Sequence, residues 1–227
     1  MSREAADGPT ITVTENGPYM LEGAAEVRDA KAATVSEAGK VFLCRCGRSS
    51  NKPFCDGTHK KVGFEGTETA DTGPIAERRD DYEAAEVTIH DDRSVCAHAG
   101  ECTDRTPSVW RLNTEPWIDP TGAPTEEIKS TIRHCPSGAL TYSEPGSGEP
   151  AEEPMSEAVK ASVDGPYHVR GGIPVISAGG EGYEVRNRQT LCRCGGSSNK
   201  PFCDGTHWKG FKDPQGEGAP EEASASA

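Results

Sequence analysis

A segment of seventeen residues occurs twice in this chain, and each copy carries three Cys and one His at the same positions. LCRCGRSSNKPFCDGTH begins at residue 43, and LCRCGGSSNKPFCDGTH begins 148 residues later, at residue 191. The two copies differ only at Arg48 and Gly196. Upstream, Gly17-Pro18-Tyr19 aligns with Gly165-Pro166-Tyr167 at the same offset. The repeat is therefore a duplicated domain of about 58 residues rather than a duplicated motif.

Composition indicates that these domains need metals to hold them together. Only 33% of the residues are hydrophobic, and 26 Gly and 17 Pro favour turns over one large core. The nine Cys fall into three groups of three, and such odd groups argue against a disulfide framework. No apolar run is long enough for a membrane span, and the N-terminus lacks the features of a secretory signal. We therefore expect a cytoplasmic protein whose thiols stay reduced and free to bind metal.

The chain divides into modules with different patterns. We expect an α+β fold of small, loop- and β-rich metal-stabilised modules. Short strands are predicted at 11–14, 167–169 and 174–176, and a turn at Asn16-Gly17. Between the repeats, residues 87–89 and 139–142 are predicted strands and 124–133 a helix. The predicted divisions are a first repeat at 10–70, a middle module at 83–143, a flexible linker at 144–157, a second repeat at 158–214 and a disordered tail at 215–227.

Each repeat carries the pattern C-x-C-x8-C-x3-H. The candidate ligands are Cys44, Cys46, Cys55 and His59 in the first repeat, and Cys192, Cys194, Cys203 and His207 in the second. C-x3-H places a sulfur and an imidazole about one turn apart, as at the start of a helix. Three thiolates and one imidazole suit a structural zinc ion, and they also suit an iron–sulfur cluster. The spacing alone leaves both open.

The longer pattern resembles the CDGSH iron–sulfur family. In the first repeat, Ser49, Pro53 and Cys55-Asp56-Gly57-Thr58-His59 match its motif, and the second repeat matches equally well. The resemblance implies a [2Fe–2S] cluster on three Cys and one His in each repeat. It also implies that two such units pair, so we expect the repeats to form an internal pseudo-dimer within a monomer. Protons compete for the single imidazole ligand, so we expect clusters that are lost faster in mild acid.

The middle module carries a second kind of site. Cys96, Cys102 and Cys135-Pro136 resemble the ligands of a single-cluster ferredoxin of the sort associated with cytochrome P450 systems, with Ala99 where another Cys is expected. Three Cys favour a [3Fe–4S] cluster; a [4Fe–4S] cluster with another fourth ligand and a structural zinc are the alternatives. His98 is the candidate for an extra ligand or for a hydrogen bond to one.

These sites predict an iron–sulfur protein that carries electrons and is not an enzyme. The alternative is cluster transfer or storage, or redox and pH sensing, through labile His-ligated clusters. The expected partner is a redox protein: a reductase, a cytochrome P450-like acceptor or an apo-protein that accepts a cluster. A net charge of −13 disfavours nucleic acid, and no membrane partner is expected. Trp208 follows His207 where Lys60 follows His59, so we expect Trp208 to shield the second site.

Overall fold

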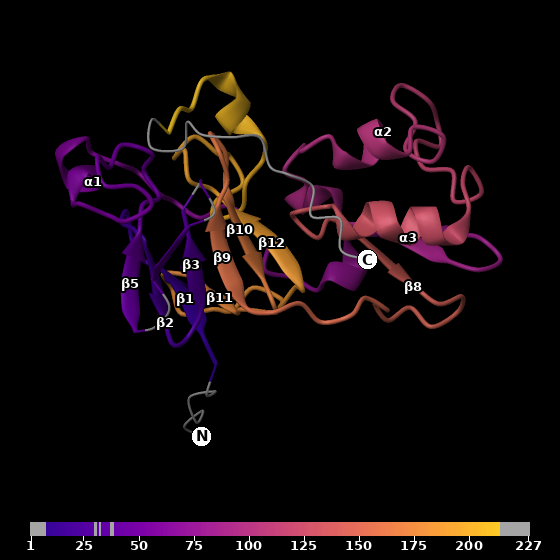
Figure 1. The fold of residues 1–227 in the computed structure, drawn as a ribbon, viewed down its shortest axis with the longest axis horizontal. Helices are drawn as coiled ribbons and strands as arrows, with labels where there is room; N and C mark the ends of the chain where they lie inside the picture. The colour runs from indigo at the N-terminus through magenta and orange to yellow at the C-terminus, as the bar shows by residue number, and fades with distance from the viewer. Residues whose placement is uncertain (1–7, 30, 32, 37–38, 214–227) are drawn as a thin grey trace.

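The fold consists of three small β-sheets joined by loops and short helices (Figure 1). A computed structural model describes residues 8–29, 31, 33–36 and 39–213. The predicted tail at 215–227 lies outside these residues. The first sheet has the order β11-β1-β2-β5, the second β12-β10-β9-β3-β4 and the third β6-β7-β8. The α+β class expected from the sequence is confirmed.

Among the described residues of the repeats, a strand lies within one residue of each predicted range, and six further strands were not predicted. The first sheet contains β1 (Thr10–Val13), β2 (Tyr19–Glu22), β5 (Lys40–Leu43) and β11 (Val175–Ile176). The second contains β3 (Glu26–Arg28), β4 (Thr34–Ser36), β9 (Ala158–Ala161), β10 (Tyr167–Arg170) and β12 (Arg188–Leu191). Alternate residues of β1 and β9 are buried in the same pattern, and so are those of β2 and β10. The duplicated sequence therefore gives a duplicated sheet.

The two repeats exchange one strand each. β3 of the first repeat pairs in parallel with β9 of the second, with Val27 opposite Val159. The equivalent strand of the second repeat, β11, pairs in parallel with β1, with Ile11 opposite Val175. The two pairings are equivalent under the 148-residue offset. The repeats thus form the expected internal pseudo-dimer, and neither sheet is complete without the other repeat.

Two buried tyrosines link the repeats at the centre of this pseudo-dimer. The rings of Tyr19 and Tyr167 meet edge to face, with centroids 6.1 Å apart. The Tyr19 hydroxyl lies 2.9 Å from the carbonyl oxygen of Cys192, and the Tyr167 hydroxyl lies 2.9 Å from that of Cys44. Burial raises the pKa of both phenols well above the usual value, so both remain neutral donors. Each repeat therefore supports the metal-binding loop of the other.

Tyr19→Phe and Tyr167→Phe should each lower the free energy of unfolding by about 1–2 kcal/mol, because a buried carbonyl loses its donor. The two losses should be similar, since the contacts are related by the repeat. Denaturant titration of the two variants measures both values. Unchanged midpoints in both variants would show that the crossed hydrogen bonds do not support the fold.

The middle module forms a separate sheet with a helix against it. Its strands are β6 (Asp80–Glu83), β7 (Thr88–Asp91) and β8 (Leu140–Ser143). Its helical segments are η2 (Arg93–Val95), α2 (Glu101–Arg105) and α3 (Thr125–Arg133), and η1 (Ile75–Glu77) precedes it. The predicted helix is present, and its Ile128 and Ile132 are fully buried. In Figure 1 the orange strands β9, β10 and β12 lie between the first repeat and this module.

The predicted linker at 144–157 contains no helix or strand among residues 144–156, and it makes specific contacts. Glu152 forms a buried ion pair with Arg188 at 2.7 Å. The Asn187 side chain accepts from the backbone N–H of Met155 and donates to the carbonyl of Glu153. These contacts hold the segment along the second repeat.

Candidate metal centres

The four candidate ligands of the first repeat, called the first site, lie in two pairs. Cys44 and Cys46 follow β5, and their sulfurs are 3.8 Å apart. Cys55 Sγ lies 3.3 Å from Nδ1 of His59, which is on α1 (Thr58–Lys61). Two sulfurs bound tetrahedrally to one metal at about 2.3 Å are about 3.8 Å apart. Each pair is therefore spaced to share one metal.

The second site repeats this arrangement with the same distances. The sulfurs of Cys192 and Cys194 are 3.8 Å apart, and Cys203 Sγ lies 3.3 Å from Nδ1 of His207. His207 lies on η3 (Thr206–Lys209), as the C-x3-H spacing predicts. Among the described residues, no group of three or more ligand side chains surrounds a point that one metal ion could fill.

Hydrogen bonds fix the loop that carries the second ligand pair. Asp56 accepts from the backbone N–H groups of Ser50 and Thr58 at 2.9 and 3.0 Å. These bonds hold the pKa of the Asp56 carboxyl well below its usual value. Gly57, at φ +83°, points its N–H at Cys55 Sγ, 3.5 Å away. Asp204 and Gly205 make the same contacts in the second site. N–H bonds to ligand sulfur are one means by which proteins tune iron–sulfur centres.

An arginine between the paired cysteines is buried in each repeat, and the sequence analysis did not identify it. Arg45 donates to the carbonyls of Gly17, Gly66 and Thr14, each at 2.8 Å. Arg193 donates to the carbonyls of Gly165 and Ser162 and forms an ion pair with Asp213. The signal available was the presence of Arg at the same place in both copies. Its role is to hold the C-x-C loop, and it places a positive charge beside each site.

Burial and a hydrogen bond between two sulfurs shift the pKa values of the thiols in the second site. Burial raises the pKa of Cys203 to about 12. The sulfurs of Cys192 and Cys194 share one hydrogen bond, which lowers the pKa of the accepting thiol and raises the pKa of the donating one. The close pair therefore favours one thiolate.

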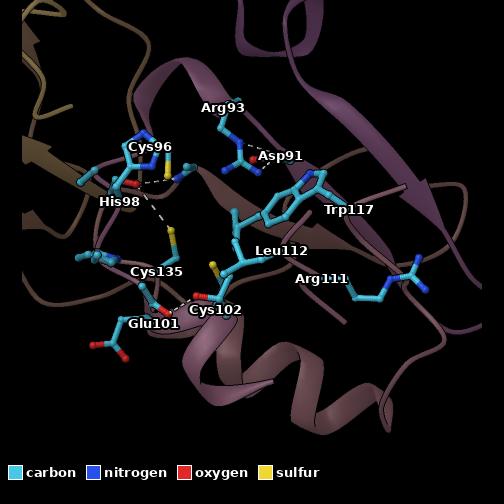
Figure 2. A pocket seen from close by; sticks show the side chains of 18 of the residues that line it. Asp91, Arg93, Cys96, His98, Glu101, Cys102, Arg111, Leu112, Trp117 and Cys135 are labelled. Carbon is cyan, nitrogen blue, oxygen red and sulfur yellow. Dashed lines mark hydrogen bonds and ion pairs between the residues drawn. The ribbon is translucent and has the colours of Figure 1, made fainter. Parts of the chain in front are cut away.

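The middle site is a cavity of about 410 Å³ (Figure 2). Cys96, Cys102 and Cys135 all line it, as predicted. Cys96 follows η2, Cys102 lies on α2 and Cys135 follows α3. Burial raises the pKa of Cys102 to about 11. The guanidinium of Arg93 lies 3.8 Å from the centre of the Trp117 ring, and both side chains form part of the cavity wall.

His98 and Ala99 also line this cavity. His98 adopts a left-handed backbone conformation at φ +52°. Its side chain packs on the second site's loop, because a Cβ built on Gly205 would lie 3.3 Å from His98 Cβ. Its role as an extra ligand stays a prediction.

Three further histidines and Trp208 lie outside the candidate ligand sets. His134 is the C-cap of α3, and His168 lies in β10. His90 lies in β7 and is buried, with Nδ1 2.6 Å from Oδ1 of Asp81. The Trp208 ring contacts the His207 ring at 4.7 Å, yet the side chain is 69% exposed. Trp208 is therefore only a partial cover for the second site.

Comparison with known proteins assigns a family to each of the three domains that carry these sites. A family model described as an iron-binding zinc finger of the CDGSH type matches residues 16–60 and 164–208. A model described as a divergent 4Fe-4S mono-cluster matches residues 82–145. The chain is also similar to the uncharacterized protein YjdI of Escherichia coli, strains K12 and O157:H7. In each case the identity is 30% over 61 residues, which is 27% of this chain and 80% of the relative.

No helix among the described residues is long and apolar enough to cross a bilayer.

CDGSH domains bind clusters of the [2Fe–2S] type, and the three cysteine groups lie within the matched domains. The chain therefore contains two CDGSH-type iron-binding domains, one on either side of a divergent 4Fe-4S mono-cluster domain.

Proposed function

We propose that the protein is an electron carrier with two [2Fe–2S] clusters and one larger cluster. The pairing of ligands supports this most directly. A [2Fe–2S] cluster has two irons, and each needs two protein ligands. Cys44 and Cys46 at 3.8 Å suit one iron, and Cys55 with His59 at 3.3 Å suits the other. Iron–sulfur clusters supply one-electron chemistry, while the protein sets their burial and electrostatic surroundings.

For the middle site we propose a [3Fe–4S] cluster on Cys96, Cys102 and Cys135. Three thiolates line the cavity, and Ala99 occupies the place expected for another Cys. A [4Fe–4S] cluster with His98 as a further ligand is the alternative.

Iron and acid-labile sulfide counts, with electron paramagnetic resonance (EPR) before and after dithionite, test this proposal. About seven irons per chain should be found with a three-iron middle cluster and about eight with a four-iron one. A Cys96→Ala variant should lose only the middle cluster's iron and signal. Zinc without labile sulfide in the unmodified protein would contradict the proposal.

Cluster transfer or sensing is the second candidate, and the exposure of the first site supports it. Cys55 and His59 are both half-buried, so an acceptor or a proton can reach them. Transfer to an apo-ferredoxin that is faster at pH 6 than at pH 8 would favour this role. Reversible reduction by a reductase without cluster loss would favour the carrier.

We further propose that the protein works as a cytoplasmic monomer with another redox protein as its partner. The crossed strands β3 and β11 support the monomer, because they complete the pseudo-dimer within one chain. Sedimentation of the cluster-loaded protein tests the oligomeric state.

A further inference from the structure

We propose that the middle module covers the second site alone, so that the middle and second clusters are electronically coupled while the first cluster is the site open to partners. This inference rests on the proposed function. The two repeats have nearly the same sequence, so differences in their surroundings come from what packs on them.

Two matched glycines show where the middle module docks. Gly57 and Gly205 both have φ +83°, and each follows a ligand cysteine by two residues. A Cβ on Gly57 would meet no atom of the described residues within 4 Å. A Cβ on Gly205 would lie 3.3 Å from the carbonyl oxygen of Ala97 and 3.3 Å from His98 Cβ. The loop from Cys96 therefore lies against the loop from Cys203.

The ligands on these loops differ in exposure accordingly. Cys203 is 2% exposed and His207 6%, whereas Cys55 and His59 are both half-buried. The loop that touches the middle module therefore carries the buried ligands, and the loop around Gly57, which touches no such neighbour among the described residues, carries the half-buried ones.

The strand before each C-x-C shows the same asymmetry. All four residues of β12 are buried, whereas only the last residue of β5 is. Arg188 of β12 donates to the carbonyl of Leu140 at 3.1 Å, and so binds β8 of the middle module. Its equivalent, Lys40, lies at the surface and pairs with Glu22.

A side chain next to the second site adds a further link. Asn199 donates from Nδ2 to the carbonyl of Ser94, at 2.7 Å, whereas its equivalent Asn51 is exposed. The middle module therefore binds the second repeat rather than the first. The main sequence difference behind this choice lies outside the repeated motif, where Arg188 stands in the place of Lys40.

Coupling allows one electron to pass between the two clusters. When an external one-electron donor, dithionite in the experiment, has reduced the middle cluster, that cluster loses one electron and the second [2Fe–2S] cluster gains it. No proton or bond changes place. The second cluster would then lose that electron to the first, and the first would lose it to an oxidised partner that approaches the half-buried Cys55 and His59.

EPR relaxation of the dithionite-reduced, cluster-loaded full chain tests the coupling. Cys55→Ala removes the first cluster and Cys203→Ala the second. The Cys55→Ala variant keeps the second cluster, and the Cys203→Ala variant keeps the first. The [2Fe–2S] signal of the second cluster should relax several-fold faster than that of the first, because only the second cluster lies beside the middle cluster. Adding Cys96→Ala to Cys55→Ala should restore slow relaxation. Equal rates in the two single variants, or a faster rate in Cys203→Ala, would overturn the inference.

A second measurement keeps all the ligands. Iron release to a chelator should be biphasic, with the first cluster in the fast phase. Gly205→Ala and Gly57→Ala impose the same backbone strain, since both positions have φ +83°. Only Gly205→Ala should also press on Ala97 and His98, which must move by a few tenths of an ångström, and it should speed iron release more than Gly57→Ala does. Equal effects of the two variants would contradict the docking. Absence of cluster signals from the unmodified chain would instead refute the proposed function.

Discussion

Asp213→Asn is expected to lower the free energy of unfolding by about 3–5 kcal/mol, because it leaves a buried guanidinium without its counter-charge. The Arg193 side chain is 0% exposed and pairs with Asp213, which is itself buried. The variant should also raise the reduction potential of the second cluster, by something on the order of tens of millivolts. An uncompensated positive charge beside the Cys192–Cys194 loop favours the more negative, reduced cluster. Denaturant titration and a spectroscopic redox titration measure the two effects.

The first repeat offers a matched control for this prediction. Glu65 stands 148 residues before Asp213 but is exposed, and Arg45 donates to the carbonyl of Gly66 instead. Glu65→Gln should therefore leave both stability and the first cluster's potential nearly unchanged. Equal shifts in the two variants would show that Asp213 does not neutralise Arg193.

This difference also predicts an order of potentials. The guanidinium of Arg45 is held by three carbonyls, without a carboxylate, whereas that of Arg193 has Asp213. The first cluster should then have the higher potential and receive electrons from the second. The direction agrees with a path from the covered site to the exposed one.

The close grouping of the candidate ligands and some of the short strands could be predicted because they depend on local pattern. C-x-C and C-x3-H fix spacing along the chain, and both Cys–His pairs are found one helical turn apart. The alternation in β1 and β9 likewise appears in the burial of their side chains. These features can be predicted without knowing which segment of the chain packs against them.

The partners of these elements could not be predicted, because the repeat makes them ambiguous. β3 and β11 are equivalent segments, so each could pair within its own repeat or with the other, and only packing selects the exchange. The motif around Gly57 and Gly205 is identical, so it cannot tell which copy the middle module covers. That choice depends on Arg188 and Asn199, whose contacts join segments far apart in the chain.

Asp92→Asn should weaken the junction between the middle module and the second repeat by about 3–5 kcal/mol. Asp92 is buried and pairs with Arg186 of the second repeat, and Nε of Arg78 lies 3.2 Å from its carboxylate. Without the carboxylate, Arg186 stays buried and uncompensated. Denaturant unfolding, with the fluorescence of Trp110 and Trp117 as a probe of the middle module, measures the loss. Glu22→Gln breaks the exposed pair with Lys40 and should cost at most about 1 kcal/mol.

The pH dependence gives this prediction a second test. Burial raises the pKa of Asp92, but hydrogen bonds from Ser94 and Arg186 and the nearby arginine charges outweigh burial and leave the pKa below its usual value. A lowered carboxyl pKa stabilises the fold fully above the unfolded value of about 3.9, and this contribution is lost as pH falls through the folded value. The difference between the unmodified chain and Asp92→Asn should therefore be constant from about pH 6 to 8 and shrink in acid. A difference that grows in acid would mean that Asp92 is not ionised at the junction, and that Arg186 is held there by carbonyls alone.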